Sequence, residues 1–112
     1  MLRTPNADRA RMLRGIILNC LHVASQGQAL NPDNPNTMGR DVLLMTLEKM
    51  ASLTSNEELH ATLNYLQGKQ YIEVAWLNDG TGSFASIELL VAGIDLAEGT
   101  TQDPGVTFRL RR

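Results

Sequence analysis

The stretch SNEELHATLNYLQGKQYIEVAW, residues 55–76, indicates a helix that begins at a defined cap. Ser55 is followed three residues later by Glu58, which is the spacing of a capping box. In that motif each side chain accepts a hydrogen bond from the backbone N–H of the other residue. The apolar positions that follow have helical spacing and form one face, which we expect to be buried: Leu59, Leu63 and Leu66.

A strand and a hairpin are expected directly after this helix. Gly68 is the expected C-cap, because glycine tolerates the backbone conformation that ends a helix. Residues 71–76 then alternate apolar and polar side chains, with the apolar set Ile72, Val74 and Trp76 on one side. NDGTGS, residues 78–83, contains the Asp-Gly pair of a hairpin turn. The returning strand alternates again, with the apolar residues Ala85, Ile87, Leu89 and Val91.

Two further helices are predicted before this segment. The first begins near Thr4-Pro5 and runs to about Ser25. Residues 25–37 form a loop rich in proline, asparagine and aspartate, and residues 39–51 form the second helix. The apolar face of the first helix consists of Leu13, Ile16, Ile17, Cys20, Leu21 and Ala24.

The chain is expected to continue beyond the hairpin. Residues 92–97 have the pattern of one short helical turn that stops at Gly99. In the final segment VTFRLRR, residues 106–112, apolar side chains alternate with polar and basic ones. Such a segment could add an edge strand to the sheet or lie on a partner.

This order of elements predicts a single α+β domain over residues 1–112. Three helices followed by a two-stranded wing hairpin and a short C-terminal extension are typical of a winged helix-turn-helix. Residues 1–8 are a candidate flexible arm, and residues 100–112 are the C-terminal extension.

Composition argues against several functional classes. Cys20 is the one cysteine, so an intramolecular disulfide is excluded and a reducing cytoplasm, here that of a host cell, is the expected location. The two histidines are in no metal-binding or catalytic motif, which predicts a non-enzymatic protein without cofactor or metal. Charged and polar residues interrupt the apolar stretches, so no membrane span is expected.

Three runs of sequence carry a resemblance to a known group of proteins. TSNEELHATLNYLQGKQYIEV, then SIELLVAGIDLAEGT, then DPGV lie within or just after the run from Gly39 to Thr100. Together they resemble small winged-helix proteins of Mu-like prophages, which are often labelled as ArsR-like regulators. The resemblance covers over half of the chain and implies a winged-helix fold and a role in transcription regulation. The cysteine cluster of the metal-sensing ArsR-like repressors is absent here.

A winged-helix fold makes the helix after Ser55 the candidate recognition helix, which enters the major groove of DNA. With its leucines buried, asparagine and glutamine would be presented outward, and both can read adenine through two hydrogen bonds. The candidate base-reading residues are Asn56, His60, Asn64 and Gln67.

The charge distribution assigns the electrostatic role to the two ends of the chain. Residues 1–14 hold four arginines and one aspartate, residues 106–112 hold three arginines, and residues 15–105 hold three cations against eleven acids. DNA-binding proteins commonly neutralise roughly 6–10 phosphates. A homodimer would bring two pairs of basic ends beside a duplex. The candidate phosphate-binding residues are Arg3, Arg9, Arg11, Arg14, Lys69, Arg109, Arg111 and Arg112.

The same charge distribution supports a second interpretation. Winged helices bind proteins as well as nucleic acids, and the fold does not decide between them. An acidic body with basic, apolar ends would suit a protein-interaction or assembly module that does not bind DNA. In that case the C-terminal arginines would pair with acidic residues of a second copy or of a phage protein partner. Both interpretations stay open at the level of sequence.

Overall fold

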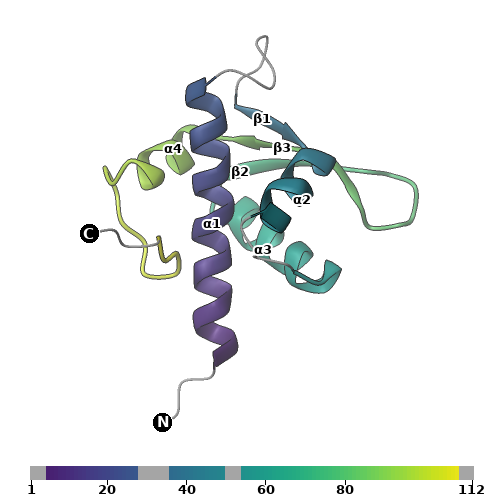
Figure 1. Ribbon diagram of the computed structural model, residues 1–112, viewed down its shortest axis with the longest axis horizontal. Coiled ribbons are helices and arrows are strands. Elements are labelled where there is room, and N and C mark those ends of the chain that lie inside the picture. The colour runs from purple at the N-terminus through teal and green to yellow at the C-terminus, as the bar shows by residue number, and fades with distance from the viewer. Residues whose placement is uncertain (1–4, 28–35, 50–53, 109–112) are drawn as a thin grey trace.

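The computed structural model describes residues 5–27, 36–49 and 54–108. Within these ranges the chain forms an α+β domain of four helices and a three-stranded antiparallel sheet, which confirms the predicted class (Figure 1). The elements in chain order are α1 (Pro5–Gly27), β1 (Thr37–Gly39), α2 (Arg40–Lys49), α3 (Asn56–Gly68), β2 (Ile72–Trp76), β3 (Phe84–Leu89) and α4 (Val91–Ala97).

The long helix α1 organises the packing of the domain. It crosses the sheet, with α2 and α3 on one side of it and α4 on the other (Figure 1). Its predicted apolar face is confirmed, because Ile17 and Leu21 are fully buried and Leu13 and Cys20 nearly so. The helix starts at Pro5 as expected and ends at Gly27. It therefore includes residues 5–8 of the candidate arm, whereas residues 1–4 lie outside the described residues.

The sheet has one strand more than the predicted hairpin. β3 lies in the centre and pairs with β2 on one side and β1 on the other. Met38 of β1 is 3% exposed and lies opposite Ile87, which also pairs with Val74 of β2. The sequence prediction placed this strand in the loop 25–37 and the start of the second helix, which is wrong. Three residues are too few to show a period-two pattern, so β1 depends on its pairing with β3.

A bulge changes which side chains of β3 face the core. Trp76 pairs with Phe84 and Ala75 pairs with Ser86, so Ala85 has no partner across the strands. Ile87 and Leu89 are buried as predicted, but Ala85 is exposed and Phe84 is buried in its place. Val91 was predicted on the same side of the strand; it begins α4 instead and is 73% exposed.

The start of α3 follows the prediction, and its end does not. Both hydrogen bonds of the Ser55–Glu58 capping box are present, and Leu59, Leu63 and Leu66 are buried. The expected C-cap Gly68 is the last helical residue, and the left-handed residue is Gln70, with φ of 66°.

Two hydrogen bonds explain the position of this helix end. The Gln70 amide donates to the Gln67 carbonyl at 2.9 Å, and the Tyr71 amide donates to the Leu66 carbonyl at 3.0 Å. These are the two bonds of a Schellman motif, which puts position C′ at Gln70. The motif therefore ends two residues beyond the glycine that the sequence suggested.

α4 ends with the same motif and a glycine at its left-handed position. Gly99 has φ of 83° and donates to the Leu96 carbonyl, and Thr100 donates to the Asp95 carbonyl at 2.8 Å. The predicted short helix with a stop at Gly99 is confirmed.

The described part of the C-terminal segment lies along α1 and forms no strand. The Thr107 amide donates to the Arg11 carbonyl at 3.0 Å, Val106 is buried, and Phe108 packs against the core. Gly15 allows this approach, since a Cβ there would collide with the Thr107 carbonyl oxygen. The alternation of residues 106–108 thus reflects packing within the chain; residues 109–112 lie outside the described residues.

Substituting Gln70 by glycine should stabilise the domain, because a side chain at φ of 66° is strained and glycine is not. The relieved strain is roughly 1–2 kcal/mol and the extra chain entropy of glycine offsets part of it, so we expect a gain of about 0.5 kcal/mol or more in the free energy of unfolding, measured by urea denaturation. The matched control is Gly99→Ala, which places a side chain at the equivalent position of α4 and should destabilise. A Gln70→Gly protein less stable than wild type would contradict the assignment of the motif.

Substituting Gly15 by alanine should displace the C-terminal segment from α1. The collision with backbone atoms of residue 107 cannot be relieved by a side-chain rotation, so we expect a loss of about 1–3 kcal/mol in thermal or urea unfolding. Gly39→Ala is the control, because the nearest atom to its Cβ would be 4.0 Å away. Equal stability of the two variants would show that the segment is not held there.

Candidate functional site

The exposed face of α3 contains only part of the predicted base-reading set. Asn56 and Asn64 are exposed. His60 is half-buried and meets Trp76 edge-on, with 5.8 Å between the ring centroids. Gln67 is half-buried, and its Oε1 accepts a hydrogen bond from the Val74 amide at 2.8 Å. Gln67 therefore connects the end of α3 to β2, which leaves the two asparagines as the outward-facing amides.

The remaining exposed positions of α3 are small or acidic. Ala61 and Gly68 lie on the same row as Asn64, and Glu57 begins that row. The spacing of four, three and four residues brings these positions onto one side of a helix. Ala61 and Gly68 were not predicted as surface residues of the site, although the burial of the three leucines already implied the row. This row of α3 carries no cation.

The described cations near α3 have partners within the chain. Nε of Arg9 donates to Glu58 at 2.6 Å and a second guanidinium nitrogen does so at 3.2 Å, which joins α1 to the first turn of α3. This contact raises the pKa of Arg9 and lowers that of Glu58, in each case mainly through the side-chain hydrogen bond. Arg11 pairs with Asp8 at 3.4 Å. Such exposed pairs add little stability, but they reduce the positive charge available to a phosphate.

Arg14 is committed to packing. Its guanidinium carbon lies 3.6 Å from the centroid of the Tyr65 ring, and the group donates to the Gly105 carbonyl at 2.9 Å. In this arrangement the planar guanidinium stacks on the aromatic ring and is held by a cation–π interaction. Arg14 thus joins α1, α3 and the C-terminal segment.

Asp103 is the centre of a polar cluster that holds the C-terminal segment to the end of α3. Its carboxylate accepts hydrogen bonds from the Tyr71 hydroxyl and from the Gly105 amide, the latter at 2.8 Å, and lies 3.2 Å from Lys69 Nζ. Its side chain is only 7% exposed. The hydrogen bond from Tyr71 is the main reason that the pKa of Asp103 is lowered, while burial and this bond raise the pKa of Tyr71 to about 12. Lys69 is therefore paired as well.

The eight predicted phosphate-binding residues are thus only partly described. Arg9, Arg11, Arg14 and Lys69 all contact other groups of the chain, and they do not converge on the exposed row of α3. Arg3, Arg109, Arg111 and Arg112 lie outside the described residues.

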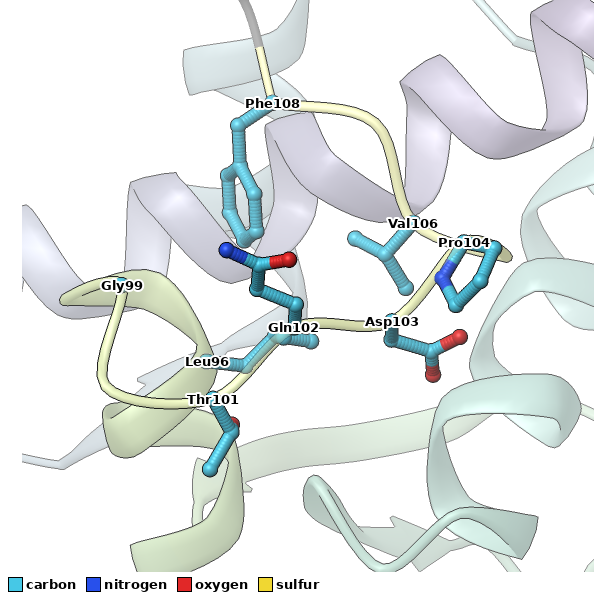
Figure 2. Close-up of a pocket in the computed structure, with 8 residues that line it drawn as sticks. All are labelled: Leu96, Gly99, Thr101, Gln102, Asp103, Pro104, Val106 and Phe108. Carbon is cyan, nitrogen blue, oxygen red and sulfur yellow. The ribbon is translucent and has the colours of Figure 1, made fainter.

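A cavity of about 340 Å³ lies beside the Asp103 cluster (Figure 2). Buried Leu96 and Val106 contribute apolar surface, and Phe108 and the amide of Gln102 line it from the C-terminal segment. Both oxygens of Asp103 already have partners. The described residues that line the cavity include no arrangement of acid, base and nucleophile.

Among the described residues no three histidine, cysteine or acidic side chains gather as a metal site would require. Cys20 is buried, which raises its thiol pKa, and His22 lies 3.1 Å from Glu98. None of the described helices is both long enough and apolar enough to cross a membrane.

Comparison of the chain with models of protein families, with curated proteins and with solved structures gave no match.

Replacing Asp103 by asparagine should destabilise the protein at neutral pH by about 1–3 kcal/mol, because the charged hydrogen bonds are lost. The pKa of Asp103 is lower in the folded than in the unfolded chain. The carboxylate therefore stabilises fully above about pH 4, and this contribution is lost as the pH falls through the lowered pKa. Urea unfolding between about pH 7 and pH 2 should show a weaker pH dependence for Asp103→Asn than for wild type. Glu48→Gln, which removes an exposed carboxylate from α2, is the control for the loss of one negative charge.

Proposed function

We propose that this protein is a winged-helix DNA-binding protein, a non-enzymatic transcription regulator of the Mu-like prophage kind, which acts as a homodimer in the host cytoplasm. The order α1, β1, α2, α3, β2, β3 supports the proposal, since α3 follows α2 after six residues and leads directly into the β2–β3 hairpin. The observation that carries it is the exposed surface of α3. Asn56 and Asn64 on this surface are amides that can read adenine, and Ala61 and Gly68, in the same row as Asn64, allow a close approach of the helix.

The β2–β3 loop is an unfavourable phosphate contact. Asp79 accepts hydrogen bonds from the hydroxyl and the amide of Thr81, and these bonds, that of the hydroxyl most, lower the pKa of Asp79 and keep it charged. Residues 78–83 contain no cation. Under the proposal, the termini therefore supply most of the attraction to the backbone through Arg3, Arg109, Arg111 and Arg112, and α3 supplies base contacts.

A second function is favoured by the charge pairing within the domain. Arg9, Arg11 and Lys69 each have a carboxylate partner. Several large apolar side chains remain exposed: Met12, Val23, Met45, Leu77 and Val91. These observations support a protein-interaction or assembly module that contacts a second copy or a phage protein in place of DNA.

Duplex binding separates the two functions. We expect wild type to bind a duplex selected from a random pool at roughly 50 mM salt, and Asn56→Ala/Asn64→Ala to bind it about tenfold or more weakly, as loss of a good base contact implies. Asn19→Ala, which removes an exposed asparagine from α1, is the control. Fluorescence anisotropy measures the affinity. Absence of wild-type binding at this salt would exclude the regulator and favour the assembly module.

The role of the C-terminal arginines has its own test. Substituting Arg109, Arg111 and Arg112 by glutamine preserves Val106 and Phe108, which the core needs. If each arginine contacts one phosphate, the slope of log affinity against log salt should fall by about 2–3. An unchanged slope would show that this end of the chain does not contact the backbone.

A further inference from the structure

The side of α1 that faces away from the sheet is not covered by any other described element. In Figure 1 this helix lies in front of the sheet, and no other element crosses over it. Four residues along the uncovered side form a stripe, here called the α1 stripe: Met12, Ile16, Asn19 and Val23. Met12 is 44% exposed and Val23 is 61% exposed, Asn19 is exposed, and Ile16 is half-buried.

The spacing of the α1 stripe is that of a surface on which a second helix packs. Its members are separated by four, three and four positions. This alternation keeps one face of a helix directed at a partner helix along its whole length. Exposed apolar side chains at such positions are removed from water when two helices pair, which favours the pairing. The stripe is therefore suited to bind another helix.

The stripe is also complementary to itself, because its spacing is the same in both directions. In an antiparallel pair of α1 helices, Met12 of each copy lies opposite Val23 of the other, and Ile16 of each lies opposite Asn19 of the other. The two Asn19 side chains are then roughly 4.5 Å apart along the helices, on either side of the two-fold axis. Their amides can hydrogen-bond each other there. A single asparagine among apolar residues fixes the register of two paired helices, at a cost in stability.

The charges beside the stripe favour the antiparallel orientation. Arg11 and His22 are eleven residues apart, which is about three helical turns, so they lie on the same flank of the stripe. His22 is 3.1 Å from Glu98 of α4, which gives the C-terminal end of this flank a carboxylate. Antiparallel pairing brings Arg11 of each copy toward Glu98 of the other, whereas parallel pairing would bring like charges together. The contact of Arg11 with Asp8 is a long one, 3.4 Å from Nη1.

We propose that the α1 stripe is a dimer interface, in which two copies of this chain pair through antiparallel α1 helices around a two-fold axis between Ile16 and Asn19. The interface rests on the proposed function only in that both require a homodimer, and it does not require DNA. Because the same surface is used on both copies, the contact closes on itself and gives a dimer in place of a fibre. The exposed asparagines of α3 are not part of it.

A charge placed in the stripe should separate the dimer. Val23→Glu puts an unpaired carboxylate between the helices, so we expect the dissociation constant of the dimer, measured by sedimentation equilibrium, to rise about tenfold or more. Val91→Glu is the matched control, because it adds the same charge at an exposed valine of α4 and should leave the dimer unchanged. Asn19→Ala should also remain a dimer, since it keeps the apolar contacts. Circular dichroism checks that each variant is folded.

Cysteine cross-linking tests the orientation of the two helices. A mixture of Met12→Cys and Val23→Cys proteins, oxidised with copper phenanthroline, should form a disulfide-linked dimer. Either variant alone should not, because its two thiols would be about 16 Å apart along the helices. Cys20 is buried, so wild type gives the background. Cross-linking of each variant alone, but not of the mixture, would show parallel helices and overturn the proposal.

The outcomes distinguish the interface from the proposed function. If wild type and Val23→Glu are equally dimeric, the α1 stripe is wrong and the homodimer uses another surface. If wild type is monomeric at its highest soluble concentration, the interface and the homodimer are both wrong, even where the monomer binds the selected duplex. If wild type is dimeric and Val23→Glu is monomeric, the interface is supported, and absence of duplex binding by that dimer overturns only the regulator.

Discussion

Burial of one face of the sheet against α1 and α3 is the constraint on which the domain depends. An isolated two-stranded hairpin is only marginally stable in water, and it needs a third strand or a helix packed against it. Ile72, Val74, Ile87 and Leu89 are buried on this face, and α1 packs across it (Figure 1). Addition of β1 protects the other edge of β3. The positions of α3 and of the hairpin relative to each other follow from this shared core.

The C-terminal segment is held by polar contacts of a different kind. Asp103 accepts hydrogen bonds from Tyr71, which precedes β2, and from its own turn, and it pairs with Lys69, while Arg14 joins Tyr65 to the Gly105 carbonyl. These groups would be costly to bury singly, but together they satisfy one another. The cluster also removes Arg14 and Lys69 from the set available to DNA. Charges that look suited to a ligand in the sequence can thus be required by the fold.

The candidate site could be predicted only in part. The helical spacing of the leucines in α3 correctly predicted that Asn56 and Asn64 are exposed to solvent, because the leucines face the core. It could not show that Gln67 bonds to the Val74 amide, since that contact depends on how β2 returns to the helix. The spacing of neighbouring residues could not predict that Arg9 pairs with Glu58 either, because the two are 49 residues apart.

The sequence by itself determined the elements whose stabilising contacts are local. Helix α3 with its capping box, the hairpin around Asp79-Gly80, the short α4 and the amphipathic face of α1 depend on neighbours within a few residues. Only the tertiary structure decided β1, the bulge at Ala85 and the course of residues 103–108. Each of these is stabilised by groups distant in the chain, and the energy of such contacts overrides local preference.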